Sequence, residues 1–218
     1  MSATVAISVT VARLRLPASA ITGALPLLDE PERAAASTRT GDVRRRYVLA
    51  PAAARVAIAA RLDTDPAAVR IAVEPGGRPV VPGVAFSLSH SGERVVIAIA
   101  APGALIGVDV ERVRARPYLD GLARRVFAHD DYERWSALPA RARPRAFATR
   151  WTEIEAVLKG RGTGIAGGLA SAIGAPGWSC APIDVGRGYV GAVAAQGSAI
   201  AVAVNELDLA DVLTRGLP

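Results

Sequence analysis

The sequence contains too few cysteines and histidines for several kinds of site. Its 218 residues include one cysteine, Cys180, and two histidines, His90 and His129. One cysteine cannot form an internal disulfide or a zinc cluster, and two histidines are too few for most histidine-rich metal sites. Any metal ion that the protein binds is therefore expected to have oxygen ligands.

Long hydrophobic runs are also missing. The longest apolar stretch, residues 95–108, is interrupted by Pro102 and Gly103 and is shorter than the roughly 20 residues of a membrane-spanning helix. Residues 1–16 lack a basic leader, and large aliphatic residues recur at every second position from Val5 to Val11, which predicts a strand and not a signal peptide. We therefore expect a soluble, cytoplasmic protein that does not bind membranes.

Lysine is almost absent, because Lys159 is the only lysine among 26 basic residues and the other 25 are arginine. With 20 acidic residues the formal net charge is +6. This surplus favours an anionic partner without distinguishing nucleic acid, a phosphorylated cofactor or an acidic protein. Basic residues occur throughout the chain, which argues against a basic tail and slightly favours a cleft between two halves.

Hydrophobic periodicity predicts an α+β fold in which the same order of elements occurs twice, with a break at residues 101–103. The pattern predicts helices over 42–62, 118–128 and 141–160, and strands over 5–11, 69–73, 84–89, 94–100, 105–110, around 183, and over 189–194 and 199–204. Each half, 1–104 and 105–218, is expected to be a small antiparallel sheet packed with helices. The two halves are expected to be similar, with the active site in the cleft between them.

The segment Ile-Gly-Val-Asp-Val-Glu at 106–111 carries two carboxylates at strand spacing. Residues two apart in a strand point the same way, so Asp109 and Glu111 share one face while Val108 and Val110 enter the core. Adjacent hard oxygen ligands suit Mg²⁺, which also takes phosphate oxygens of a substrate. A strand end that merely enters solvent explains the pair equally well at this point.

A second segment, 151–159, places Trp151, Glu155 and Lys159 four residues apart on one helical face. An exposed Glu–Lys pair of this kind is common on helix surfaces. The single lysine of an arginine-rich chain nevertheless favours a specific role, because a compact ammonium suits a phosphate or a leaving oxygen better than the planar guanidinium.

Serine, histidine and arginine residues elsewhere add candidate anion sites. Phe-Ser-Leu-Ser-His-Ser-Gly at 86–92 predicts a strand that runs into a turn, where hydroxyls, an imidazole and turn amides can bind phosphate. An ordinary capped turn remains the plainer interpretation. Further basic groups lie at Arg33, at residues 44–46 and at Arg78, although charge runs of this kind usually form solvated faces.

Taken together and in this order, these motifs resemble the 4′-phosphopantetheinyl transferase superfamily. The resemblance is carried by Gly-Arg-Pro at 77–79, Phe-Ser-Leu-Ser-His-Ser at 86–91, Ile-Gly-Val-Asp-Val-Glu at 106–111, Trp-Thr-x-x-Glu-Ala-x-x-Lys at 151–159 and Gly-Thr-Gly-Ile at 162–165. Length and organisation resemble the larger, monomeric type that activates surfactin synthetase, and not the short trimeric holo-acyl-carrier-protein synthases.

The resemblance implies transfer of the phosphopantetheine arm of coenzyme A to a serine of an apo acyl or peptidyl carrier protein, with release of adenosine 3′,5′-bisphosphate. Magnesium is the implied metal, with manganese as the alternative, since both take oxygen ligands. The metal ligands implied by position are Asp109, Glu111 and Glu155, of which Asp109 also counts as part of the coenzyme A site. The coenzyme A contacts implied are Lys159 on the phosphate that gains charge, Ser89 and His90 on phosphates, Arg46 and Arg33 near the 3′-phosphate, and Arg78 in place of the family's lysine.

The general base and two departures from the family pattern leave alternatives open. Glu155, directly or through a bound water, is the expected base for the carrier serine, and Asp131 is a weaker alternative. Ile154 stands where the family usually has lysine and continues an apolar helical stripe, so it is expected to pack. Pro51 indicates that the first long helix is kinked or begins after it.

Two rival functions follow from these features. The replacement at Ile154 motivates a catalytically weak relative that binds coenzyme A or a carrier protein. The net charge alone motivates a nucleic-acid-binding module, but only 5% of the residues are aromatic and no nucleic-acid motif is recognisable. We therefore expect no nucleic-acid partner.

Overall fold

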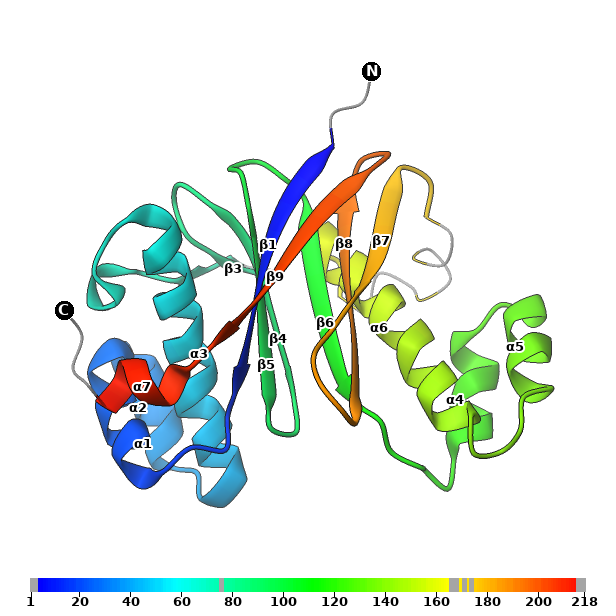
Figure 1. Cartoon of the computed structure of the whole chain (residues 1–218), viewed down its shortest axis with the longest axis horizontal. Coiled ribbons are helices and arrows are strands. Elements are labelled where there is room, and N and C mark those ends of the chain that lie inside the picture. Colours follow the sequence, from blue (N-terminus) through cyan, green and yellow to red (C-terminus); the bar gives the residue numbers. More distant parts are fainter. Residues whose placement is uncertain (1–3, 75–76, 165–168, 170–171, 173–174, 215–218) are drawn as a thin grey trace.

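Two β-sheets pack face to face and carry helices on their outer faces (Figure 1). The structure is a computed structural model and describes residues 4–74, 77–164, 169, 172 and 175–214. Its helices are α1 (Ala18–Ala24), α2 (Glu30–Ser37), α3 (Gly41–Leu62), α4 (Leu119–Val126), α5 (His129–Ser136), α6 (Arg143–Arg161) and α7 (Leu209–Thr214). Its strands are β1 (Val5–Arg13), β2 (Ala72–Val73), β3 (Pro79–Val80), β4 (Ala85–Ser91), β5 (Arg94–Ala100), β6 (Ile106–Arg112), β7 (Trp178–Ile183), β8 (Tyr189–Gln196) and β9 (Ile200–Leu207). The predicted α+β class is confirmed.

The first sheet has the strand order β4-β5-β1-β9 and the second has the order β6-β8-β7, while β2 and β3 form a short ribbon. Side chains alternate between the two faces of each sheet, so one face packs against the other sheet and the opposite face packs against helices. Ile7, Val9 and Val96 face the second sheet, where they meet Val108 and Val193. The opposite face of the first sheet is covered by α3, and that of the second by α6. In the described ranges no helix is both long and apolar enough to cross a membrane.

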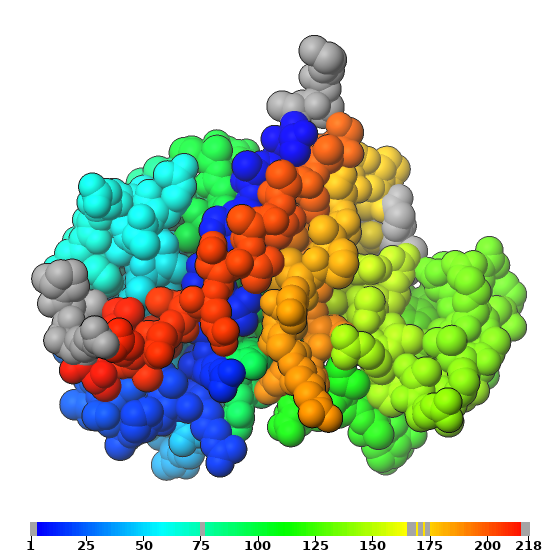
Figure 2. All heavy atoms as spheres, in the orientation of Figure 1, coloured from blue at the N-terminus to red at the C-terminus, as the bar shows by residue number. Residues whose placement is uncertain are grey.

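The last strand departs from the predicted organisation. We predicted that a strand at 199–204 completes an antiparallel sheet in the second half, and this partner is wrong. Strand β9 pairs in parallel with β1, with Val5 opposite Ile200 and Ala12 opposite Leu207, and Figure 2 shows it lying across the front of the molecule. A period of two fixes which side chains share a face but not which strand is the neighbour. The first sheet is therefore mixed and not purely antiparallel.

The first long helix also differs in detail from the prediction. Asp42, where the predicted helix begins, lies in the first turn of α3 and pairs with Arg45 at 2.5 Å, while the cap position is Thr40. The helix runs through Pro51 without ending there. It is fastened to α2 by Arg55, which is 1% exposed and lies 2.9 Å from the carboxylate of Glu32.

A close backbone contact fixes the position of α6 on the second sheet. Gly107 of β6 faces this helix, and a Cβ atom there would lie 1.9 Å from the carbonyl oxygen of Ala156 and 2.5 Å from the nitrogen of Gly160. Only glycine allows the two backbones to approach so closely. Residues two and four positions further along a strand share a face, so Asp109 and Glu111 also point to the side of α6.

We predict that Gly107→Ala destabilises the protein by about 1–3 kcal/mol, because the added methyl group must push α6 away from β6. Urea unfolding followed by circular dichroism measures the change. Gly121→Ala is the matched control: Gly121 lies in α4 with nothing within 4 Å of an added Cβ, so alanine should stabilise by up to about 1 kcal/mol. Equal stability of the Gly107→Ala variant and the unmodified protein would show that the contact is not tight.

Candidate functional site

A pocket of about 380 Å³ lies where β4, β6 and α6 meet. Its lining consists of Leu88, Ser89, His90, Asp109, Val110, Glu111, Trp151, Glu155 and Lys159. Three segments that are far apart in the sequence thus supply one site. The predicted shared faces are confirmed, because both carboxylates of β6 and all three residues spaced by four on α6 line the same pocket, while Val108 and Val110 are buried.

Asp109 is the buried centre of the pocket. Only 5% of the residue is exposed, and its Oδ1 atom accepts hydrogen bonds from Lys159 Nζ at 2.6 Å and from Ser89 Oγ at 2.7 Å. The ammonium of Lys159 also donates to Ser89 Oγ at 2.8 Å. The other carboxylate oxygen of Asp109, Oδ2, is buried without a hydrogen-bond partner in the described part of the chain. Such an atom costs free energy unless a ligand, an ion or water satisfies it.

Glu155 and Glu111 add two more carboxylates beside Asp109. Burial raises the pKa of Glu155, and the negative charges of Asp109 and Glu111 raise it further, while Lys159 opposes the shift. The same repulsion would be relieved by a cation between them. Hard oxygen donors, one of them unsatisfied, fit a divalent ion such as Mg²⁺ or Mn²⁺.

These carboxylates do not form a finished metal cage by themselves. Across residues 4–74, 77–164, 169, 172 and 175–214, no three His, Cys, Asp or Glu side chains are grouped closely enough to hold a metal ion. Magnesium commonly takes one or two carboxylates and completes its shell with water and substrate phosphate oxygens. The pocket therefore fits a metal ion whose coordination is completed by water, or by phosphate oxygens when such a ligand is bound, and Mg²⁺ stays a prediction.

His90 lines the pocket, and Arg46, which does not line it, lies near enough to influence the charge of His90. Withdrawal from water lowers the pKa of His90 below its usual 6.5, and the positive charges of Arg46 and Lys159 lower it further. His90 is therefore mainly uncharged at neutral pH. Arg46 reaches this place from the first turns of α3. Anions are favoured where these groups converge.

Arg78 lines a neighbouring pocket of about 280 Å³ together with Gly77, Pro79, Phe86, Ser87, Leu88, Lys159, Gly162 and Gly164. The two pockets share Leu88 and Lys159, so they form adjoining parts of one surface. Ile165, the last residue of the predicted Gly-Thr-Gly-Ile motif, lies outside the described residues.

Three predicted residues do not line either pocket: Arg46, which lies near His90, and also Arg33 and Asp131. Arg33 lies on α2, where its guanidinium donates to the carbonyl of Leu28 and pairs with Glu30. Asp131 lies on α5 and pairs with Arg134 and, at 3.1 Å, with Arg150. Glu155 is therefore much better placed than Asp131 to act in this pocket.

Ile154, which stands where the family usually has lysine, is a core residue of α6. Ile154 is 1% exposed and belongs to the core around α6, so the prediction that it packs is confirmed. Arg150, a basic residue one turn before Ile154 on the same helix, is paired with Asp131 and Glu153. Arg161 lies with its guanidinium carbon 5.8 Å from the ring centre of Trp178.

The comparisons with known proteins agree on one family. The family model described as the 4′-phosphopantetheinyl transferase superfamily matches residues 105–206, from the start of β6 into β9. The chain is similar to this superfamily over these residues, which make up a little under half of its length. The matched residues include Asp109 and Glu111 of β6 and the candidate site residues Glu155 and Lys159 of α6. The match begins after Ser89 and His90 of β4.

Three similar curated proteins carry the name of the family. The chain is 31% identical to a putative 4′-phosphopantetheinyl transferase of Synechocystis over 60% of its own length and 54% of the relative. It is 33% identical to the transferase HetI of Nostoc over 56% and 54%, and 38% identical to the transferase psf-1 of Bacillus pumilus over 45% and 42%. The matched segments thus span about half the length of these relatives.

We predict that Arg46→Gln raises the pKa of His90, because one of the positive charges that lower it is removed. Proton NMR titration measures the shift, and the chain's two histidines make the imidazole signals easy to assign. Arg44→Gln is the control, since Arg44 is an exposed residue of the same helix that does not contribute to the His90 shift. An unchanged His90 pKa in Arg46→Gln would mean that Arg46 does not face this pocket.

Proposed function

We propose that the protein transfers the 4′-phosphopantetheine arm of coenzyme A to a serine hydroxyl of an apo acyl or peptidyl carrier protein and releases adenosine 3′,5′-bisphosphate. The observation that carries this proposal is the convergence of Asp109, Glu111, Glu155 and Lys159 with His90 in one pocket. Residues 1–104 would supply the nucleotide side, and residues 105–218 the metal ligands and the catalytic helix, as in the larger monomeric type.

The proposed coenzyme A contacts follow the positive side of the site. His90 and Arg46 would bind phosphates, because an uncharged imidazole donates one hydrogen bond and the guanidinium supplies charge. Arg78, in the adjoining pocket, is assigned to the nucleotide. Arg33 would need to exchange its contact with Glu30 for the 3′-phosphate, so its role is the least supported of these.

The reaction is a displacement at phosphorus. The carrier serine oxygen forms a bond to the phosphorus that bears the pantetheine arm, and the bond from that phosphorus to the bridging pyrophosphate oxygen breaks. Asp109, Glu111 and Glu155 would hold a divalent ion, which would supply positive charge to neutralise the pyrophosphate. Lys159 would stabilise the negative charge that develops on the phosphate as the bond breaks.

Glu155 is the proposed acceptor of the serine proton, directly or through a water. Its carboxylate lies in the pocket with the phosphate-binding groups, where it can accept a proton from a bound hydroxyl or water. In the chain alone, burial and the neighbouring carboxylates raise the pKa of Glu155.

A catalytically weak relative that only binds coenzyme A or carrier protein is the second candidate. It is favoured by Ile154, which fills the family's usual lysine position with a core side chain. Incubation of the protein with coenzyme A, Mg²⁺ and several apo carrier proteins separates the two functions. A carrier mass increase equal to one phosphopantetheine arm supports the transferase, whereas coenzyme A binding with no mass increase on any carrier supports the binding protein.

An apolar pocket with an arginine rim is the proposed contact for the carrier protein. It has a volume of about 320 Å³ and shares Glu111 and Trp151 with the central pocket. Its floor is formed by Leu119, Leu122, Val126, Phe147 and Leu169, and its rim by Arg112, Arg114, Arg116 and Arg125. This combination suits an acidic amphipathic surface, whose apolar residues enter the pocket while its carboxylates meet the rim.

We predict that Lys159→Ala lowers kcat by about 10²–10³-fold, because a charge that stabilises the transition state is lost. The coenzyme A dissociation constant, measured by calorimetry, should change much less. Lys159→Arg should restore only part of the rate, since the planar guanidinium must replace an ammonium held between Ser89 and Asp109 at 2.8 and 2.6 Å. Unchanged turnover in Lys159→Ala would remove this residue from the mechanism.

We also predict that Arg116→Glu raises the KM for the carrier protein several-fold at low salt, corresponding to about 1 kcal/mol, and leaves coenzyme A binding intact. The defect should shrink as salt is added, because exposed charges are screened. Arg70→Glu provides the control: the charge change is the same, but Arg70 lies outside this pocket, beside η2 (Pro66–Ala68), where it contacts the carbonyl of Ala67. Equal defects in both variants would contradict the proposed contact.

A further inference from the structure

The hydroxyl of Ser91, at the end of β4, bridges to the carboxylate of Glu111 on β6. Ser91 Oγ donates to Glu111 Oε2 at 2.8 Å and accepts from the backbone N–H of Arg112 at 3.0 Å. Because the accepted bond comes from a rigid strand backbone, the hydroxyl has a fixed position from which its proton points at the carboxylate. Ser91 belongs to none of the pocket linings.

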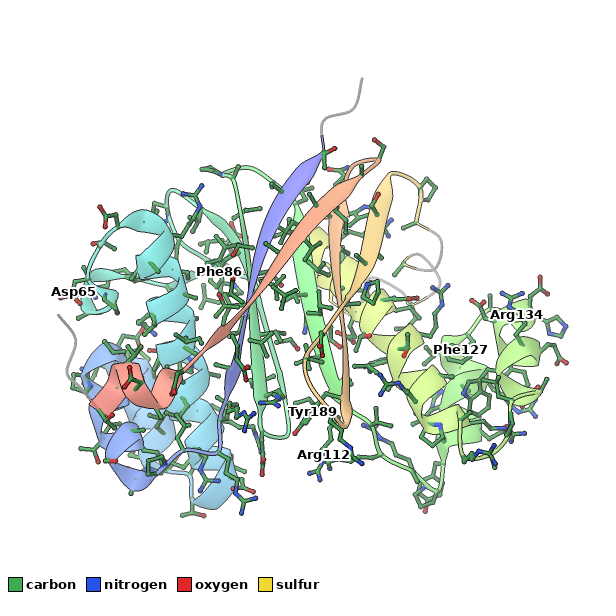
Figure 3. The ribbon with its side chains drawn as sticks, in the orientation of Figure 1. Asp65, Phe86, Arg112, Phe127, Arg134 and Tyr189 are labelled. Carbon is green, nitrogen blue, oxygen red and sulfur yellow. The ribbon has the colours of Figure 1, made fainter. Side chains whose placement is uncertain are left out.

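The turn that follows Ser91 is fastened to the second sheet. Tyr189 of β8 accepts a hydrogen bond from the backbone N–H of Glu93 at 3.0 Å, and its hydroxyl lies 2.7 Å from where a Cβ of Gly92 would be. Tyr189 and Arg112 lie close together at the lower end of the second sheet (Figure 3). This contact holds the end of β4 against β6 and limits the movement of Ser91 relative to Glu111.

Ser91 and Ser89 occupy equivalent places along β4, two residues apart on the face toward β6. Ser89 holds Asp109, and Ser91 holds Glu111. The two serines differ in one respect: Ser89 also contacts Lys159, whereas the hydrogen bonds of Ser91 go to the carboxylate and to the backbone of Arg112. A change at Ser91 therefore leaves the lysine contact of the pocket intact.

A free glutamate side chain loses rotamer freedom when it binds a ligand, at a cost of up to about 2 kcal/mol. A hydrogen bond that already holds one carboxylate oxygen reduces this cost and leaves the other oxygen available. Hydrogen-bond partners behind metal ligands commonly affect metal affinity or activity by about 10–100-fold. Glu111 lines the central pocket and is half-buried, so its carboxylate is both held and accessible.

We propose that Ser91 is a positioning residue that holds the Glu111 carboxylate in the orientation that binds a divalent cation. The proposal rests on the metal site of the proposed function, but it concerns cation binding and not the transfer step. Ser91 itself contacts neither the cation nor the reacting groups. Its effect is expected to pass entirely through Glu111.

The test is the affinity of the purified protein for Mn²⁺ alone, measured from the electron paramagnetic resonance signal of the free ion. Ser91→Ala should raise the Mn²⁺ dissociation constant about 10-fold. Ser91→Thr keeps the hydroxyl and should restore most of the affinity. In a Glu111→Gln background, Ser91→Ala should have little further effect, because the group through which it acts is already lost.

Ser87→Ala is the matched control for loss of a serine from the same face of β4. Its hydroxyl accepts from the backbone N–H of Val108 and contacts no carboxylate, so the variant should keep the unmodified Mn²⁺ affinity even if its melting temperature falls. Ser91→Cys, which has a similar size but donates a much weaker hydrogen bond, gives the same comparison if alanine prevents folding.

Three results would overturn the proposal: no Mn²⁺ binding by the unmodified protein, Mn²⁺ affinity within twofold of it in both Ser91→Ala and Ser91→Cys, or equal effects of Ser91→Ala with and without Glu111→Gln. Failure of the transferase proposal looks different. In that case no carrier protein gains mass, while the dependence of Mn²⁺ affinity on Ser91 and Glu111 is still observed.

Discussion

The contact between Gly107 of β6 and the backbone of α6 sets the geometry on which the site depends. Because no side chain separates the two elements, the carboxylates of Asp109 and Glu111 reach the same pocket as Glu155 and Lys159. A larger residue would widen this spacing. The geometry of the site thus depends on the lack of a side chain at Gly107. The repeats of the strand and the helix then determine which functional side chains point into the pocket.

Electrostatic balance explains why a lysine occurs here in an otherwise arginine-rich chain. Asp109 is buried, and burial of an unpaired carboxylate is costly. Lys159 neutralises it in the structure while Oδ2 stays without a partner. A guanidinium has five donors in a planar fork and would need more acceptors than this corner supplies. The ammonium balances the buried charge, yet it remains free to turn toward a phosphate.

Local periodicity was sufficient to predict the central site but not its surroundings. The shared faces of Asp109 with Glu111 and of Glu155 with Lys159 follow from the strand and helix repeats, and both are observed. The partner of β9 depends on a contact across almost the whole described chain, which no local pattern encodes. In the sequence, Ser91 stood out only as the third serine at every second position from Ser87. Its contact with Glu111 could not be predicted without knowing that β6 lies beside β4. Arg33 followed from the family resemblance alone, and its contacts are with its sequence neighbours Leu28 and Glu30.

The pairing of β9 with β1 also has a consequence for how the molecule is made. Val5 lies beside Ile200, so one edge of the first sheet receives its neighbour only after nearly all of the described chain has been synthesised. High contact order of this kind slows folding and couples distant segments. A cut between β5 and β6 would therefore separate β1 from β9, the strand that pairs with it.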